Sequence, residues 1–497
     1  MSALVAVDGR EVRSAHAETA DVVVVGSGPA GATVAWRLAA RGARVVVVEE
    51  GHAWRPEEHV GSGVRAMARL YRDLGTSIAL GDNPMPYLQG RAVGGTSVVN
   101  GAICWSFPEE VHAAWVAADP GVGAALPFEA LRADELELEA RLNVRPTAPG
   151  VAGAKADVMA RGAEALGLAH RPIRRNTTGC RGSGRCLQGC PTGAKLSMDR
   201  SLVPDAVRDG ARILSGVRAT RVLLEGDRAV GVVGRSAGGG WVEVRAARVV
   251  LAASAIQTPN LLRASGLRSG PVGDGLCGHP GVSVTGRFAE PVRNHLGATQ
   301  GHEITGLRHE GLKIETLGFD LSILASRIPG AGRELARRVA EADHYAVHGA
   351  ALRAEGRGSV RPGWRGPRVR IGLTPSDVRL ARRGVRRMGE VLLAAGALEV
   401  YPGVAGFDPV VTDPRRLAAL DDLPHDPRAL PMSVTHLFGT ARMGSDPATS
   451  VVRPGDLRHH RVEGLHVADS SVFPTNLGVN PQVPIMAVAS RCAAALA

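Results

Sequence analysis

Three glycines near the start of the chain have the spacing of a dinucleotide-binding loop. Gly26, Gly28 and Gly31 form a GxGxxG string directly after the β-branched run 21–25. Glycine lets the backbone approach a pyrophosphate closely, and the N-terminus of the following helix favours its negative charge. Glu49 is placed to accept a hydrogen bond from a ribose hydroxyl, and an acid there disfavours a 2′-phosphate. The unit predicts a site for FAD or NAD and does not distinguish them.

A second glycine-rich segment, residues 90–101, favours FAD. Its double glycine, followed by small hydroxyl residues and an asparagine, would let the backbone pass under a flat ring and offer N–H donors to it. An ordinary glycine turn is the alternative interpretation. The candidate cofactor contacts in this segment are Arg91, Gly94, Gly95, Thr96, Ser97 and Asn100.

Three cysteines lie close together in the middle of the chain. Cys180, Cys186 and Cys190 fall within one short loop, and Pro191 follows the last of them. Thiolates are the usual ligands of iron–sulfur clusters, and Cys-Pro often ends such loops. Three cysteines would suit a 3Fe-4S cluster and disfavour a four-cysteine zinc site. A loop of free thiols, or one disulfide in a structural arm, explains the same residues.

The elements around these motifs predict an α/β protein. The run 21–25, a helix over 32–41 and the run 44–49 form a βαβ unit, which requires a parallel sheet. Further strands are expected over 218–233 and 241–252, on either side of the glycine turn 238–240. Helices are expected over 128–142, 376–395 and from residue 483 onward.

The distribution of these patterns predicts a discontinuous cofactor domain. We assign it residues 1–110, 198–285 and 430–497, with a connecting arm over 111–197 that carries the cysteines. Residues 286–429 differ in composition and are expected to form a substrate-binding domain.

Composition argues against nucleic-acid binding and against a membrane span. The formal net charge is +11, but the basic residues are scattered, and the densest run, 379–388, is typical of a solvated helix face. The N-terminus lacks the pattern of a signal peptide, and no stretch approaches the ~18 apolar residues of a membrane span. Residence in the cytoplasm is the expectation.

Several strings, spread in order along the chain, resemble signatures of the glucose-methanol-choline (GMC) oxidoreductase family. The segment 90–101 is similar to the first signature, and 253–262 with 265–267 to the second. Near the C-terminus, 436–444 resembles the H-x-x-G-T-x-R-M-G string, and 465–474 resembles the stretch beneath the flavin. The resemblance has departures: Cys104 and Phe107 follow the first signature, and Arg268 follows the second where glycine is usual.

The resemblance implies a Rossmann-like FAD domain with a parallel sheet and a second domain built on an antiparallel sheet flanked by helices. It also implies oxidation of a small-molecule alcohol, in which hydride leaves a CH–OH carbon for flavin. His436 matches the position of the catalytic histidine, and a neutral imidazole is a suitable acceptor for the hydroxyl proton. Asn480 would hold the substrate oxygen without taking the proton.

Other family positions carry over to cofactor contacts. Asp469 and Ser470 would face the ribityl and pyrophosphate part of FAD, and Gln482 the pyrimidine edge of the ring. Val217 and Ala253 are further candidate contacts. Some family members attach FAD covalently through a histidine next to the signature asparagine. Val99 stands there, so non-covalent FAD is expected.

The electron acceptor and two other activities stay open. Oxygen would make the protein an oxidase, and a quinone or redox partner would make it a dehydrogenase. The cysteine loop resembles the cluster loop of the family's electron-relaying dehydrogenases and favours the second. A hydroxynitrile-lyase-like enzyme that keeps FAD without net redox chemistry is one alternative, and an NAD-dependent dehydrogenase is another.

Overall fold

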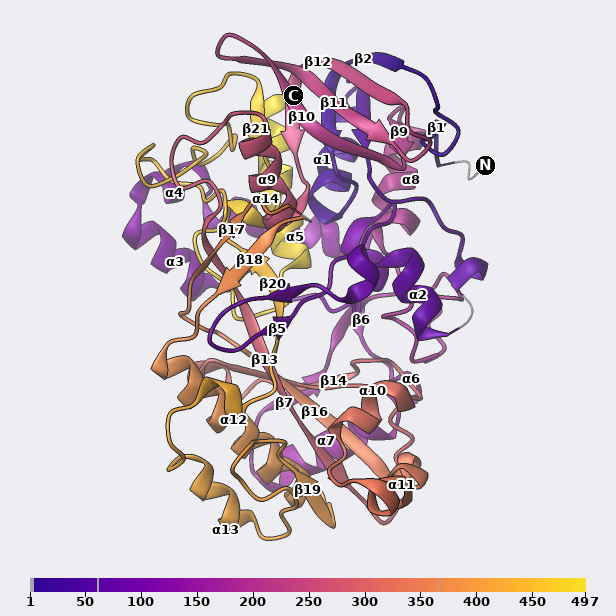
Figure 1. The fold of residues 1–497 in the computed structure, drawn as a ribbon, viewed down its shortest axis with the longest axis vertical. Helices are drawn as coiled ribbons and strands as arrows, with labels where there is room; N and C mark the ends of the chain where they lie inside the picture. Colours follow the sequence, from indigo (N-terminus) through magenta and orange to yellow (C-terminus); the bar gives the residue numbers. More distant parts are fainter. Residues whose placement is uncertain (1–3, 60–61, 365) are drawn as a thin grey trace.

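The computed structural model describes residues 4–59, 62–364 and 366–497. Residues 1–3 and 60–61 of the predicted cofactor domain, and residue 365 of the predicted substrate domain, lie outside the described residues. The chain forms two lobes, each built around one large sheet, and the first described strand, β1 (Val7–Asp8), and the C-terminus both lie in the upper lobe of Figure 1.

The upper lobe contains a mixed sheet in which the GxGxxG loop follows a buried parallel strand. Val22–Val25 and Val45–Val48 are at most 5% exposed, as expected for parallel strands covered on both faces. The strand order is β1 (Val7–Asp8), β9 (Arg212–Ser215), β3 (Val45–Val48), β2 (His16–Val25), β12 (Trp241–Leu251), β11 (Arg228–Ser236) and β10 (Val217–Glu225), with β21 (Leu465–Val467) beside β12. In this order the first five strands and β21 run parallel, and β11 and β10 extend the sheet antiparallel.

The lower lobe is built on an antiparallel sheet. The strand order is β18 (Arg368–Ile371), β17 (Gly358–Arg361), β13 (Asp274–Arg287), β16 (Tyr345–Leu352), β15 (Leu312–Thr316), β14 (His302–Ile304) and β7 (His170–Pro172), with β19 (Glu399–Tyr401) and β20 (Ser433–Phe438) also beside β13. The longest strand, β13, runs from the middle of the molecule into the lower lobe and pairs with β16, β17, β19 and β20 (Figure 1).

Helices cover these sheets. In the upper lobe, α1 (Pro29–Ala39) starts directly after the glycine loop and packs against α8 (Leu202–Arg208) and α14 (Gln482–Leu496). In the lower lobe, α12 (Pro375–Ala394) begins with a capping box and packs on β13 and β16. The other helices are α2 (Gly63–Leu70), α3 (Glu109–Ala118), α4 (Pro120–Ala125), α5 (Phe128–Arg141), α6 (Pro149–Ala152), α7 (Ala154–Ala165), α9 (Ser254–Ala264), α10 (Leu321–Leu324), α11 (Gly332–Ala340) and α13 (Pro414–Leu417).

The predicted fold class, a parallel sheet domain with a second domain on an antiparallel sheet, is confirmed. The antiparallel sheet extends beyond the range 286–429, because β7, most of β13 and β20 lie outside it. The division of the chain at the expected boundaries stays a prediction. No helix in the described ranges is both long and apolar enough to cross a membrane.

The basic run 379–388 on α12 is only partly a solvated face. Arg383 is exposed, whereas Arg382 is buried and donates to the carbonyls of Leu423 and Pro424. Arg386 and Arg387 both pair with Glu390. Part of this positive charge is therefore bound within the fold, and the rest lies at the surface.

Candidate active site

A cavity of about 880 Å³ is lined by residues from both sheets. Most of the sequence-predicted site residues line it, although they come from widely separated parts of the chain. They are Gly26, Gly28, Glu49, Gly95, Thr96, Ser97, Asn100, Val217, Ala253, His436, Asp469, Ser470, Asn480 and Gln482. Gly31, Arg91 and Gly94 do not line the cavity, and the side chain of Arg91 is exposed.

The GxGxxG loop closes by direct backbone contact between two glycines. Gly26 has φ 101°, a conformation that favours glycine. A Cβ atom on Gly31 would lie 1.9 Å from the carbonyl oxygen of Gly26, so no side chain fits there. Gly28 precedes α1, whose N-terminus opens onto the cavity. The loop has the shape that an approaching pyrophosphate requires.

Glu49 holds the glycine loop in place from the end of β3. Its carboxylate accepts hydrogen bonds from the N–H and hydroxyl of Ser27, at 2.9 and 2.7 Å, and from the N–H of Gly51 at 2.7 Å. Burial raises the pKa of this carboxyl, and those hydrogen bonds oppose the rise. Because Glu49 also lines the cavity, it can accept from a ribose hydroxyl there.

The second glycine segment packs directly on the first. Gly94 has φ 97° and donates its N–H to the hydroxyl of Ser27 at 3.0 Å. A Cβ atom on Gly95 would lie 2.7 Å from Cα of Gly28. A side chain at position 95 would prevent this close approach of the two loops. Gly94 helps to hold the two loops together through its hydrogen bond to Ser27, and it does not line the cavity.

Asp469 joins the C-terminal segment to the strand–helix junction at Ser254. Its carboxylate accepts from the N–H of Ser254 at 2.9 Å, the hydroxyl of Thr258 at 2.5 Å and the N–H of Ser471 at 2.8 Å. Ser254 has φ 90°, which is uncommon outside glycine. Asp469 therefore stabilises a strained turn at the wall of the cavity.

Several buried polar atoms around the cavity have no partner within the described chain. Asn100 donates to the side-chain oxygen of Gln482 at 2.6 Å, which leaves the amide nitrogen of Gln482 unpaired. The amide oxygens of Gln89 and Asn480 and the amide nitrogen of Gln257 are unpaired too. Buried polar groups are normally hydrogen-bonded, so this cavity is suited to a polar ligand.

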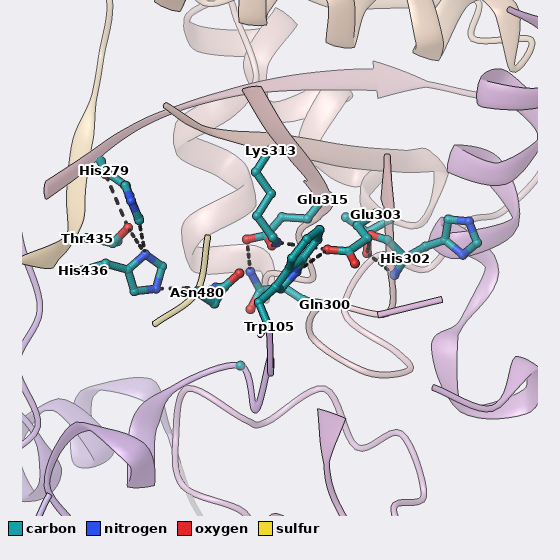
Figure 2. A network of polar contacts seen from close by, with 12 residues as sticks. Trp105, His279, Gln300, His302, Glu303, Lys313, Glu315, Thr435, His436 and Asn480 are labelled. Carbon is teal, nitrogen blue, oxygen red and sulfur yellow. Dashed lines mark hydrogen bonds and ion pairs between the residues drawn. The ribbon is translucent and has the colours of Figure 1, made fainter. Parts of the chain in front are cut away.

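His436 lies on β20 at a bulge that turns its side chain into the cavity. It has φ 51°, and Gly278 of β13 faces two residues of β20 at this point. Bulges and positive φ values outside glycine concentrate at functional sites. Nε2 of His436 lies 3.4 Å from the amide nitrogen of Asn480, so the predicted pair does meet (Figure 2).

On its other side, His436 contacts a histidine that the sequence analysis missed. Nδ1 of His436 lies 2.9 Å from Nδ1 of His279 on β13 and 3.3 Å from the hydroxyl of Thr435 (Figure 2). Burial, with a smaller effect of the Lys313 charge, lowers the pKa of His436 to about 3. The imidazole is therefore neutral at ordinary pH.

A buried ionic network lies beyond Asn480 in Figure 2, and it too was missed. Lys313 pairs with Glu303 and Glu315, and Glu315 accepts a hydrogen bond from Gln300. Gln300 and Glu315 line the cavity. The alternation of charged residues in 313–315 could have marked this strand, but nothing in the sequence places it beside residue 480.

The cysteine loop does not form the expected metal centre. Sγ of Cys186 lies 3.1 Å and Sγ of Cys180 3.8 Å from the guanidinium of Arg175, whereas Cys190 accepts from the N–H of Lys195 at 3.4 Å. Nowhere in the described ranges do three or more His, Cys, Asp or Glu side chains converge as metal ligands. The 3Fe-4S prediction is therefore not supported: two of the thiols contact Arg175, the third contacts Lys195, and all three are free.

Comparison with known proteins gives the family. A GMC oxidoreductase N-terminal family model matches residues 20–281 and a C-terminal one residues 356–489. A GMC-type oxidoreductase of Mycobacterium tuberculosis is 38% identical over 95% of this chain and 74% of its own length. The long-chain-alcohol oxidase FAO1 of Arabidopsis thaliana is 28% identical over 94% of this chain and 65% of its own length.

Solved structures agree with the fold. Pyridoxine 4-oxidase from Mesorbium loti matches with a TM-score of 0.72 at 19% identity, over 96% of this chain and 98% of its own. A variant of formate oxidase from Aspergillus oryzae RIB40 matches with a TM-score of 0.70 at 18% identity, over 96% and 98%. The predicted enzyme class is confirmed, and the chain belongs to the GMC oxidoreductase family.

Proposed function

We propose that the protein binds FAD non-covalently in the cavity. The glycine loops and Glu49 at one end suit the dinucleotide, and the unpaired amide of Gln482 suits the edge of a flavin ring. A volume of about 880 Å³ falls within the range of sites for ligands of this kind. The buried side chain of Val99 offers no atom for covalent attachment where some relatives have histidine.

The reaction we propose is the oxidation of an alcohol to a carbonyl compound. When bound, FAD supplies the acceptor for the hydride that leaves the CH–OH carbon. His436 takes the hydroxyl proton at Nε2, and Asn480 holds the hydroxyl oxygen. The observation that carries this proposal is the meeting of His436 and Asn480, at 3.4 Å, in the same cavity as the glycine loops.

Oxygen is the electron acceptor that we propose. The family relatives in Arabidopsis thaliana are named long-chain-alcohol oxidases, and the structural neighbours include two oxidases. The free thiols at 180, 186 and 190 do not converge on a site for an electron-relaying cluster. These names also favour a small-molecule alcohol as the substrate.

The test is anaerobic addition of alcohols to purified protein, followed by admission of oxygen. We expect a bound yellow chromophore that bleaches with a carbonyl product, then regains its colour in oxygen with formation of hydrogen peroxide. Colour that persists while substrate is cleaved would identify a lyase. A colourless protein that reduces added NAD would identify the other alternative, and either result would overturn the proposal.

A further inference from the structure

One cationic side chain of the lower lobe faces the cavity without a counter-ion. Arg327 follows α10 and lines the cavity beside Ser283, Leu317 and Phe319. Its guanidinium donates to the hydroxyl of Ser283, and no carboxylate in the described ranges pairs with it. A guanidinium has five N–H donors, so most of its hydrogen-bonding capacity is unused.

The other charges near this wall are balanced. Lys313 and Arg171 pair with Glu303 and Glu315 in the buried network, two cations with two carboxylates. Burial lowers the pKa of Arg327, and no neighbouring carboxylate counters that effect. Holding a half-buried cation without a partner costs free energy, which an anionic ligand would offset.

The register of β13 relates Arg327 to the reactive end of the cavity. His279, Gly281 and Ser283 alternate along this strand and share one face, because side chains of a strand repeat every second residue. His279 contacts His436, and Ser283 contacts Arg327. Four residues of extended strand span roughly 13 Å, so Arg327 lies well away from the site of hydride loss.

The wall between these two points consists mainly of small residues, with Ser433 opposite Gly281 and the carboxylate of Glu315, which is paired with Lys313, two strands away from Ser283. Gly281 and Ala350 lie on paired strands and line the cavity, and Leu317 and Phe319 lie beside them. A ligand that runs from His436 to Arg327 therefore meets a hydroxyl-binding pair first, then a largely apolar stretch that contains one serine hydroxyl, and a cation last.

We propose that the substrate is a hydroxy acid with an apolar chain, whose carboxylate is bound by Arg327 while its hydroxyl lies at His436 and Asn480. This inference rests on the proposed function, because it names the substrate class of that reaction. A guanidinium and a carboxylate form two parallel hydrogen bonds, which fixes the far end of the chain. The product would be the corresponding oxo acid, formed as hydride leaves the carbinol carbon for FAD and the hydroxyl proton goes to His436.

The test uses a ligand that cannot be oxidised, so that it does not depend on turnover. Binding of decanoate and of its neutral analogue decanamide to the oxidised holoenzyme is measured by calorimetry. We expect the wild type to prefer the carboxylate, and Arg327→Gln to weaken decanoate binding about tenfold to a hundredfold with less effect on decanamide. Arg327→Lys keeps the charge but loses the paired hydrogen bonds, so we expect an intermediate preference.

Arg333→Gln is the matched control, because Arg333 is exposed and does not line the cavity. It removes the same charge and should keep the wild-type preference, and thermal unfolding checks that each variant is folded. Equal binding of the two ligands by the wild type, or an equal loss in Arg333→Gln, would overturn the inference. If the protein prefers the carboxylate but no alcohol reduces its flavin, the carboxylate site at Arg327 stands and the proposed oxidation is wrong.

Discussion

Nδ1 of His279 lies 2.9 Å from Nδ1 of His436, so the two imidazoles share one hydrogen bond. The N–H of Gly478 donates to Nε2 of His279 at 2.9 Å, and burial keeps the pKa of His279 well below its usual value. A neutral His279 therefore carries its proton on Nδ1 and donates it to His436. It follows that neutral His436 holds its own proton on Nε2 in this arrangement.

Thr435 offers the contact that the proton-accepting form of His436 requires. To take a hydroxyl proton at Nε2, neutral His436 must instead carry its own proton on Nδ1, and the hydrogen bond from His279 must break in that form, because two N–H groups cannot share it. The Thr435 hydroxyl lies 3.3 Å from Nδ1 of His436 and donates to the carbonyl of His279 at 3.4 Å, so it can accept from His436. We expect Thr435→Val to slow anaerobic flavin reduction about threefold to tenfold. Thr435→Ser keeps the hydroxyl and should retain the rate, and equal slowing of both variants would contradict this role.

The pH dependence of flavin reduction should reflect the low pKa of His436. Its imidazole accepts a proton only when neutral, and burial, with the charge of Lys313, holds its pKa at about 3. We expect no loss of rate as the pH falls through 6.5, the ordinary imidazole value, and an acid limb near pH 3. Stopped-flow reduction at saturating alcohol over this range measures it. A decline centred near pH 6.5 would be the opposite result.

His348 should make the protein less stable in acid. Both of its ring nitrogens lack a partner in the described chain, and burial, followed by the charge of His302, lowers its pKa to about 3. The unfolded chain takes up this proton near pH 6.5 and the folded chain only near pH 3, so stability falls as the pH falls between those values. We expect the free energy of unfolding of His348→Leu to fall less steeply, by up to about 1.4 kcal/mol per pH unit. Parallel curves for variant and wild type in denaturant titrations would refute this.

Substitution of Gly31 and substitution of Gly28 in the first glycine loop should have different effects. A Cβ on Gly31 would collide with the backbone of Gly26, whereas the nearest atom to a Cβ on Gly28 is Cα of Gly95 at 3.9 Å. We expect Gly31→Ala to lower the unfolding temperature of the apoprotein. We expect Gly28→Ala to leave it unchanged and to reduce the amount of bound FAD, because residue 28 lines the cavity. Thermal unfolding and flavin content together separate the two effects, and full FAD content in Gly28→Ala would count against this placement of the dinucleotide.

The local patterns of the sequence predicted elements of both lobes well. The β-branched run before Gly26 became β2, and the periodic pattern over 376–395 became α12. His279 and His436, in contrast, are 157 residues apart and meet only because β20 pairs with β13. Strand pairing across such a distance leaves no local signal, which is why His279, Lys313 and Arg327 were not found.

The cysteine loop is the opposite case, because a local sequence pattern there predicted a cluster that the structure does not support. The spacing of Cys180, Cys186 and Cys190 allows a cluster. The side chain of Arg175 contacts two of these thiols, and the backbone N–H of Lys195 donates to the third. The spacing of cysteines shows that their side chains could bind one metal site. Whether the thiols point to a common centre depends on the residues that pack around them.

The central claim, that His436 helps a CH–OH carbon lose hydride to bound FAD, can be tested in a single turnover. Wild-type and His436→Ala holoenzymes are mixed anaerobically with one alcohol, either unlabelled or deuterated at the carbinol carbon. We expect the wild type to bleach, more slowly with deuterium, and the variant to retain FAD but bleach about 10²–10⁴-fold more slowly. Reduction of the variant at the wild-type rate would contradict this role of His436. So would the absence of a deuterium effect in both proteins under conditions in which the chemical step limits the rate.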